Sequence, residues 1–137
     1  MAKIDSAKLW SLNYRLVANV LADVSAEVAA LGLEVKELFV LSEMDEHPYP
    51  AELAGSLCIP KPTVTAYLKR LESAGLVRRE IDAADLRRHR LGLTAAGRKV
   101  LGHGMELLSS AFGARLGRLT GAEQGELRRL FEKLSDD

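Results

Sequence analysis

The sequence predicts a mainly α-helical fold with one small β-hairpin. Over most of the 137 residues, apolar side chains recur at steps of three or four, which is the spacing of one face of a helix. The pattern changes near Leu76–Ile81 and Arg90–Leu93, where apolar and polar residues alternate. Because a period of two is typical of a strand, these segments predict a hairpin with a polar, arginine-rich connection over 82–89.

Two helices are predicted before residue 48. The first covers about 6–30, where Ser6 is placed to cap it and an apolar stripe runs from Leu9 to Val28. The second covers about 34–44. The run His47-Pro48-Tyr49-Pro50 ends it, because proline cannot continue the hydrogen-bond ladder of a helix.

Two closely spaced helices follow. Pro50 suits the first turn of a short helix over 51–57, and Cys58-Ile59-Pro60 predicts a turn. The next helix covers 61–73, and Gly75 is placed to end it. Its inward-facing stripe comprises Val64, Leu68 and Leu71.

Two helices close the chain. Thr94 is placed to cap a helix over 95–119. Thr120 and Glu123 have the spacing of a capping box, in which each side chain accepts a hydrogen bond from the other residue's backbone. They open a last helix that runs to about residue 135.

The charges are unevenly distributed although the net charge is zero. Residues 60–99 carry ten basic and four acidic side chains, a net charge of +6. The preceding 59 residues carry four basic and nine acidic side chains, and the remainder carries five and six. Such a basic centre is the electrostatic signature of a protein that binds a polyanion.

Several classes of protein are not supported. The single cysteine excludes an internal disulfide, and neither an apolar leader nor about 18 consecutive apolar residues occur, so we expect a cytoplasmic protein without a membrane segment. His47, His89 and His103 fall in different elements without the spacing of metal ligands, so no metal site is predicted. No catalytic set of residues is found, and we do not expect an enzyme.

The segment from 50 to 94 predicts a helix-turn-helix followed by a basic wing that binds duplex DNA. A helix placed in the major groove reads bases with residues near its N-terminus, while threonine hydroxyls and lysine or arginine charges suit base edges and phosphates. Arginines on the wing suit the minor groove, and Asp85 is placed to pair with one and stabilise the tip. The predicted DNA contacts are Lys61, Pro62, Thr63, Thr65, Ala66, Lys69, Arg70, Arg87, Arg88 and His89.

Several motifs then occur in a specific order: Leu53-Ala54, Thr63-Val64-Thr65, Leu71-Glu72-Ser73-Ala74-Gly75-Leu76-Val77-Arg78-Arg79, Asp82-Ala83-Ala84-Asp85-Leu86-Arg87 and Leu93-Thr94-Ala95-Ala96-Gly97. In this order they resemble the MarR family of bacterial transcription regulators, and the last two are the most specific.

The resemblance implies a winged helix-turn-helix flanked by N- and C-terminal dimerisation helices. It implies a single MarR-like domain over 1–137, with a DNA-binding lobe at 34–94 and a helical dimerisation region at 6–32 and 95–135. The implied protein is a homodimer that binds a pseudo-palindromic operator in double-stranded DNA. Many similar members are repressors released by small molecules, so a small aromatic or anionic effector is expected and no other cofactor.

The chain departs from the family pattern at three places. Cys58 stands where the turn usually has glycine, Pro60 stands where a polar cap is usual, and Ala66 stands where a large polar residue is frequent. These departures predict that few bases are read by the recognition helix, with greater weight on Thr63 and Thr65 and on the wing.

Three alternatives stay open at this stage. Trp10, Asn13, Tyr14 and Arg15 either line an effector pocket or belong to dimer, core or surface positions. Cys58 is either a half-buried turn residue or the sensor of a redox-responsive regulator. The winged helix is also compatible with a protein-interaction module that does not bind DNA.

Overall fold

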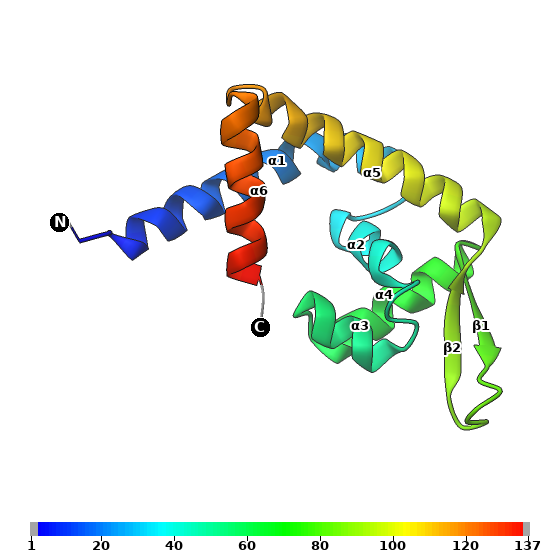
Figure 1. Ribbon diagram of the computed structural model, residues 1–137. Helices are drawn as coiled ribbons and strands as arrows, with labels where there is room; N and C mark the ends of the chain where they lie inside the picture. Colours follow the sequence, from blue (N-terminus) through cyan, green and yellow to red (C-terminus); the bar gives the residue numbers. More distant parts are fainter. Residues whose placement is uncertain (1–2, 136–137) are drawn as a thin grey trace. The chain divides into compact units, whose positions relative to one another are not determined.

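The computed structural model describes residues 3–135 and confirms a mainly helical fold with a two-stranded wing (Figure 1). Its contacts form two compact units, each described here by itself. The central unit is Ser25–Leu107, and the terminal unit comprises the described parts of Met1–Val24 and Leu108–Asp137. In chain order the elements are α1 (Ser6–Ala30), α2 (Val35–Glu43), α3 (Pro50–Leu57), α4 (Lys61–Ser73), β1 (Val77–Ile81), β2 (His89–Leu93), α5 (Ala95–Leu116) and α6 (Gly121–Ser135).

The core of the central unit is built from the predicted apolar stripes. α2, α3 and α4 contact one another, and Val64, Leu68 and Leu71 of α4 are buried as predicted. Gly75 follows α4 with a φ of +76°, a conformation that favours glycine and ends the helix. The largest fully buried side chains of this unit include Leu38, Leu41, Met44 and Leu53.

β1 and β2 pair antiparallel, with Val77 opposite Leu93 and Ile81 opposite His89. Val77, Leu91 and Leu93 are buried, which is the alternation expected of strands with one face on the core. The predicted strands are therefore confirmed, with ends that differ by one residue.

The Leu93-Thr94-x-x-Gly97 motif joins β2 to α5. The Thr94 hydroxyl donates to the Gly75 carbonyl at 2.6 Å and accepts from the Gly97 amide at 3.0 Å, so it links the two segments and caps the helix. A Cβ on Gly97 would lie 2.0 Å from the Leu76 carbonyl oxygen. Only glycine fits this close approach of α5 to the chain before β1.

The predicted end of α5 is wrong by three residues. The helix ends at Leu116 and not at Leu119, and the amides of residues 117–119 close tight turns there. The Gln124 side-chain amide donates to the Leu116 carbonyl at 2.8 Å, which satisfies one of the carbonyls left free at the helix end.

The terminal unit exposes much of its apolar surface. The predicted capping box forms, with the Thr120 amide 2.9 Å from Glu123 Oε1 and the Glu123 amide 3.2 Å from Thr120 Oγ1. α6 has no buried residue in its described length.

Within residues 3–135 no single helix is long and apolar enough to span a membrane. Only α1 and α2 together, bent at their junction, have the length and composition for it.

Candidate nucleic-acid interface

α3 and α4 form a helix-turn-helix whose turn depends on Cys58. This residue has φ +53° and ψ +39°, and it is the one non-glycine residue with positive φ in residues 3–135. In this conformation its amide bonds the Ala54 and Gly55 carbonyls. A left-handed L-residue costs roughly 1–2 kcal/mol, whereas glycine avoids the cost. The turn therefore favours the glycine that MarR-like sequences usually carry here.

The face of α4 opposite its buried stripe is exposed. The Thr65 hydroxyl donates to the Lys61 carbonyl at 3.0 Å, so its proton is used within the helix and its oxygen can still accept. Ala66 offers no polar group. The face therefore presents two ammonium groups and few hydrogen-bonding groups. Its exposed residues are Lys61, Pro62, Thr65, Ala66 and Lys69, and Thr63 is half-buried.

α4 begins without a side-chain cap. Pro60 holds the N-cap position, and its carbonyl accepts from the Thr63 and Val64 amides at 3.0 and 3.1 Å. Pro62 lies in the first turn, where its missing N–H removes one donor that a polar cap would otherwise satisfy. The two prolines thus take the place of the polar cap usual in the family.

Arg70 lies on the flank of α4 that faces α2. Its guanidinium is 3.3 Å from Glu34 and 3.1 Å from Glu37, whose side chain is only 4% exposed. It also lies over the Tyr67 ring, 5.5 Å from the centroid. These contacts engage Arg70 within the unit although its side chain is 56% exposed, so they compete with the predicted contact to a phosphate. The helical pattern alone did not show that the flank of residue 70 meets two glutamates.

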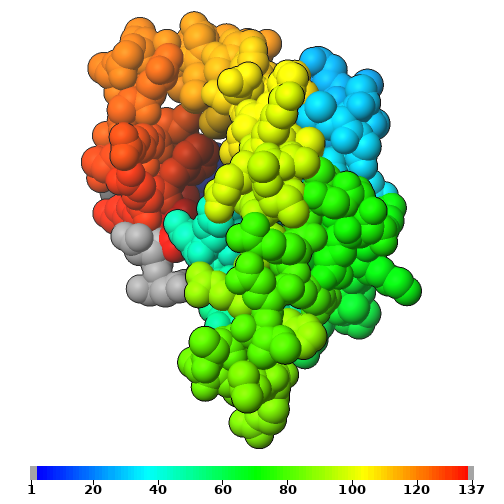
Figure 2. Space-filling model, turned by 90° about the vertical axis from the view of Figure 1, so that its right-hand side faces the viewer, coloured from blue at the N-terminus to red at the C-terminus, as the bar shows by residue number. Residues whose placement is uncertain are grey.

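The wing tip is shaped by Asp85, as the sequence suggested. Asp85 Oδ1 accepts from the Arg87 amide at 3.0 Å and from Arg87 Nε at 3.2 Å. The Arg87 side chain is 91% exposed, so the guanidinium projects from the tip although one edge is paired. The hairpin end forms the green protrusion at the bottom of Figure 2.

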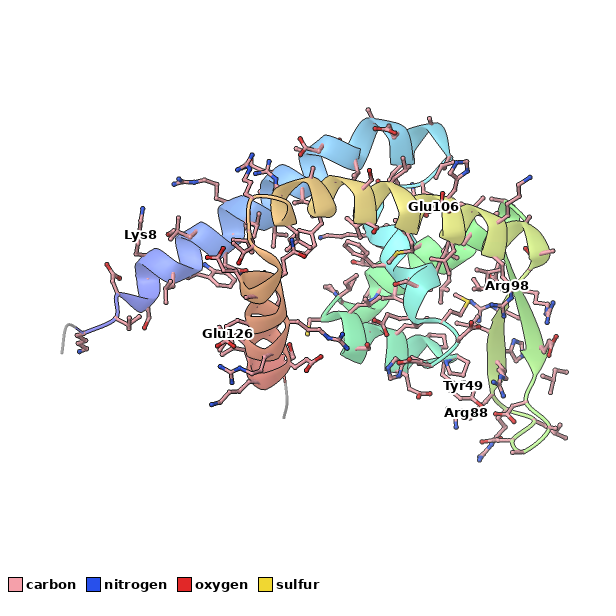
Figure 3. All side chains as sticks on the ribbon, turned by 45° about the horizontal axis from the view of Figure 1, so that its top comes forward. Lys8, Tyr49, Arg88, Arg98, Glu106 and Glu126 are labelled. Carbon is pink, nitrogen blue, oxygen red and sulfur yellow. The ribbon has the colours of Figure 1, made fainter. Side chains whose placement is uncertain are left out.

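Arg88 is held differently, against a residue that the sequence analysis did not select. Its guanidinium lies 3.6 Å from the centroid of the Tyr49 ring, and Figure 3 shows the two side chains together. The Tyr49 hydroxyl donates a short hydrogen bond to Asp82. This bond raises the pKa of Tyr49 and lowers the pKa of Asp82. The sequence signal for Tyr49 was its position between two prolines. Its partner Asp82 lies 33 residues away, so the sequence did not indicate the contact.

Six of the ten basic residues in 60–99 form ion pairs inside the central unit. These are Arg70, Arg78, Arg79, Arg87, Arg88 and Arg98. The other four, Lys61, Lys69, Arg90 and Lys99, have no ion pair within the described residues. His89 is exposed on β2. The charge available to an external anion is thus smaller than the sequence total suggests.

Comparison with known proteins identifies the arrangement. A model of the MarR family matches residues 33–89, which contain every residue predicted to contact DNA. Over its full length the chain is 33% identical to the HTH-type transcriptional repressor Rv2887 of Mycobacterium tuberculosis, and the alignment covers 100% of both proteins. The chain belongs to the MarR family. Members of the MarR family are DNA-binding transcription regulators, so the predicted function class and the expectation that the chain is no enzyme are confirmed.

Solved structures of the same relative resemble this MarR-family chain. Rv2887 in complex with DNA matches with a TM-score of 0.78 and 32% identity, over 93% of this chain and 98% of that chain. Rv2887 in complex with p-aminosalicylic acid matches with a TM-score of 0.77 at the same identity and coverage.

The four residues predicted for an effector pocket do not share one hollow. Trp10, Tyr14 and Arg15 line a shallow depression on α1. Asn13 instead lines a separate apolar cavity of about 220 Å³ in the terminal unit, with residues of α5 and α6 that include Phe112 and Phe131. Asn13 and Tyr14 are successive residues of α1 and point about 100° apart around the helix axis, so they line different hollows.

Cys58 is exposed, so the expectation of a half-buried turn residue is wrong. The left-handed turn at the end of α3 directs the side chain outward, where its sulfur lies 3.8 Å from the Gly55 carbonyl. The thiol is therefore accessible to solvent in the chain by itself.

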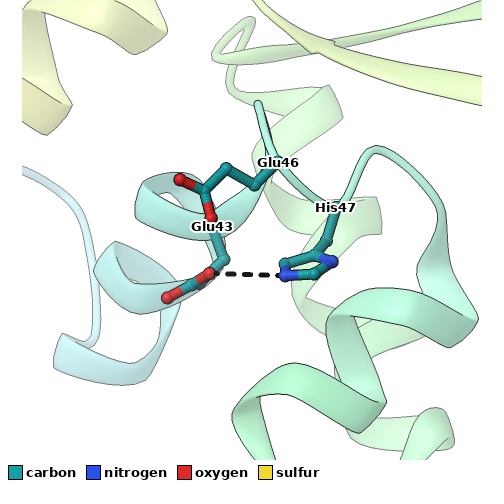
Figure 4. A group of neighbouring side chains, drawn as sticks. All are labelled: Glu43, Glu46 and His47. Carbon is teal, nitrogen blue, oxygen red and sulfur yellow. Dashed lines mark ion pairs between the residues drawn. The ribbon is translucent and has the colours of Figure 1, made fainter. Parts of the chain in front are cut away.

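One group of possible metal ligands gathers at the end of α2 (Figure 4). Glu43, Glu46 and His47 offer atoms within 4.8 Å of one another, and His47 is also 3.9 Å from Glu52. These side chains are exposed or half-buried. The imidazole nitrogens lie 3.9 Å from Glu43 and from Glu52, and exposed acidic groups are common without an ion, so we assign no metal to the group.

Proposed function

We propose that this chain is an effector-responsive repressor that acts in the cytoplasm and binds a pseudo-palindromic operator as a homodimer. In this proposal residues 34–94 bind DNA, residues 6–32 and 95–135 dimerise, and 1–137 act as one domain. The proposed contacts keep the predicted set except Arg70 and Arg88, whose guanidinium groups are engaged within the lobe. They are Lys61, Pro62, Thr63, Thr65, Ala66, Lys69, Arg87 and His89.

The observation that carries the proposal is that the central unit has two exposed basic surfaces, one on α4 and one on the wing. α4 presents Lys61 and Lys69 on its outer face, and the wing presents Arg87 from a tip that Asp85 stabilises. A recognition helix with a flanking basic loop suits a major groove and an adjacent minor groove.

A second copy of the chain is the proposed partner of the terminal unit. Leu9, Leu12 and Val17 of α1 and Phe131 of α6 are between 42% and 56% exposed. Contiguous exposed apolar surface marks an interaction site, and dimerisation would remove it from water. Light scattering tests this directly: we expect twice the chain mass of 15.0 kDa, and a monomer at micromolar concentration would contradict the proposal.

A small aromatic acid is the proposed effector. The relative Rv2887 is described in complex with p-aminosalicylic acid. In this chain Trp10 and Tyr14 line one depression with Arg15, which supplies aromatic faces and a guanidinium for a carboxylate. Titration of the protein–DNA complex with salicylate is expected to release the DNA, and Arg15→Gln is expected to reduce this response without changing the affinity for DNA.

The test of DNA binding is fluorescence anisotropy with a duplex from upstream of the gene and a scrambled duplex of the same composition. Preference for the upstream duplex is expected, and equal binding of both would remove sequence-specific regulation. No measurable binding of either would favour the protein-interaction module.

Exposure of Cys58 favours one further candidate, a redox-responsive regulator. Peroxide oxidises an accessible thiolate to a sulfenic acid, with the peroxide reduced to water or an alcohol. Loss of DNA affinity on peroxide treatment, absent in Cys58→Ser, would support this candidate, whereas the same response in both proteins would exclude it.

A further inference from the structure

We propose that Tyr49 is the positioning residue that fixes the wing relative to the helix-turn-helix, so that Arg87 meets DNA in a set place. This inference rests on the DNA-binding function proposed above. Tyr49 is the N-cap of α3, extended at φ −126° and ψ +141° between Pro48 and Pro50. Because a following proline disfavours the helical region and both prolines have a fixed φ, the tyrosine projects from a stiff segment.

Tyr49 contacts both residues that close the wing loop. Its hydroxyl donates to Asp82, immediately after β1, and its ring faces the guanidinium of Arg88, immediately before β2. The Asp82 amide also donates to the Arg88 carbonyl at 3.0 Å. One side chain from the start of α3 therefore holds the point at which the loop leaves the sheet.

Neighbouring contacts attach the same segment to the hairpin. The Leu91 amide of β2 donates to the Pro48 carbonyl at 2.8 Å, and Arg88 lies 3.8 Å from Glu52 of α3. Since α3 packs on α4, the wing is connected through Tyr49 to the helix that presents Lys61 and Lys69. Arg87 at the tip has only its own neighbour Asp85 as an ion-pair partner within the described residues.

The internal turn of the loop does not depend on Tyr49. Asp82 uses Oδ2 for the tyrosine and Oδ1 for the Ala84 amide, at 2.8 Å. Asp85 and the Arg87 and Arg88 amides form the rest of the tip. Tyr49→Phe therefore removes an attachment of the loop while leaving the turn and the stacked ring in place.

The experiment is a double-mutant cycle of Tyr49→Phe and Arg87→Ala, measured as affinity for the upstream duplex. We expect Tyr49→Phe to weaken binding by about three- to tenfold, because DNA must then order a wing that has lost one net hydrogen bond, and to lower the melting temperature by only a few degrees. In the Arg87→Ala background the same change is expected to have less than about a twofold effect, because the wing then has no guanidinium to position. Wild-type affinity in Tyr49→Phe, or full additivity in the double variant, would overturn the inference.

Hydrogen exchange without DNA separates this inference from the proposed function. Tyr49→Phe is expected to accelerate exchange of the Asp82 amide, which bonds the Arg88 carbonyl where the loop leaves the sheet. Tyr67→Phe, the same change beside Arg70, is expected to leave this exchange unchanged. Unchanged wing exchange in Tyr49→Phe would overturn the role of Tyr49 even if DNA binds. Faster wing exchange in Tyr49→Phe, together with no DNA binding by the wild type, would refute the proposed function and the role of the wing on DNA. It would still establish that Tyr49 attaches the wing to the helix-turn-helix.

Discussion

The recognition helix and the wing both carry arginines that look alike in the sequence, but they engage them with different partners. On α4, Arg70 turns toward Glu34 and Glu37 and leaves the outer face to Lys61 and Lys69. On the wing, one arginine is stacked on Tyr49, and this attachment lies next to Arg87, which is 91% exposed.

The difference separates charge that stabilises the lobe from charge that is available to DNA. In each region an arginine binds the protein's own carboxylates or aromatic ring, and a neighbouring cation is exposed. A net charge of +6 over 60–99 therefore overstates the number of phosphate contacts.

The largest effect on this comparison is expected from Arg87→Ala. Loss of a guanidinium that enters a groove should weaken operator binding by about 1–3 kcal/mol, because the duplex has no substitute partner. The matched control is Arg78→Ala, an exposed arginine on the same hairpin that pairs with Glu80, for which little change is expected. Equal affinities of wild type and Arg87→Ala in anisotropy titrations would end the claim for the wing.

Arg70→Ala should instead act on the stability of the fold. Glu37 has a nearly buried side chain but Arg70 is 56% exposed, so removal of the cation should lower the free energy of unfolding by about 0.5–1 kcal/mol in urea titrations. The DNA affinity of the folded variant is expected to stay close to that of the wild type. A loss of DNA affinity at unchanged stability would instead show that Arg70 contacts DNA.

These two arginines also show what the sequence could predict. α1 and α4 were predicted at their observed bounds because apolar stripes and glycines are local signals. The predicted cap of α1 was wrong, because Asp5 and not Ser6 accepts the Lys8 amide at the start of the helix. The Asp85–Arg87 contact joins residues only two positions apart, so the sequence could predict it as well. Arg70 with Glu34 and Tyr49 with Asp82 pair across 36 and 33 residues, so they depend on how helices and strands pack, which no periodicity reveals.

Lys69→Ala tests the exposed half of the recognition helix. A lysine on phosphate contributes without reading sequence, so upstream and scrambled duplexes should lose affinity equally. The slope of log K against log salt concentration should become shallower by about two, because each protomer of a dimer loses one phosphate contact. Loss confined to the upstream duplex would show that Lys69 reads a base.

The smallest effect is expected at the turn between α3 and α4. Cys58→Gly relieves the backbone strain of an L-residue in the left-handed conformation. We expect the free energy of unfolding to rise by about 0.5–1 kcal/mol in thermal or urea unfolding. Cys58→Ala, which keeps a Cβ, is the matched control and should give no gain. Destabilisation by glycine would show that the cysteine side chain supports the turn.

The most direct test of the central claim is the salt dependence of operator binding by the wild-type protein. If each protomer of a dimer uses Lys61, Lys69 and Arg87, log K should fall with log salt concentration with a slope of about −5. A slope shallower than about −1 would contradict phosphate binding by this surface, and a slope beyond about −12 would show that the paired arginines also leave their carboxylates for DNA.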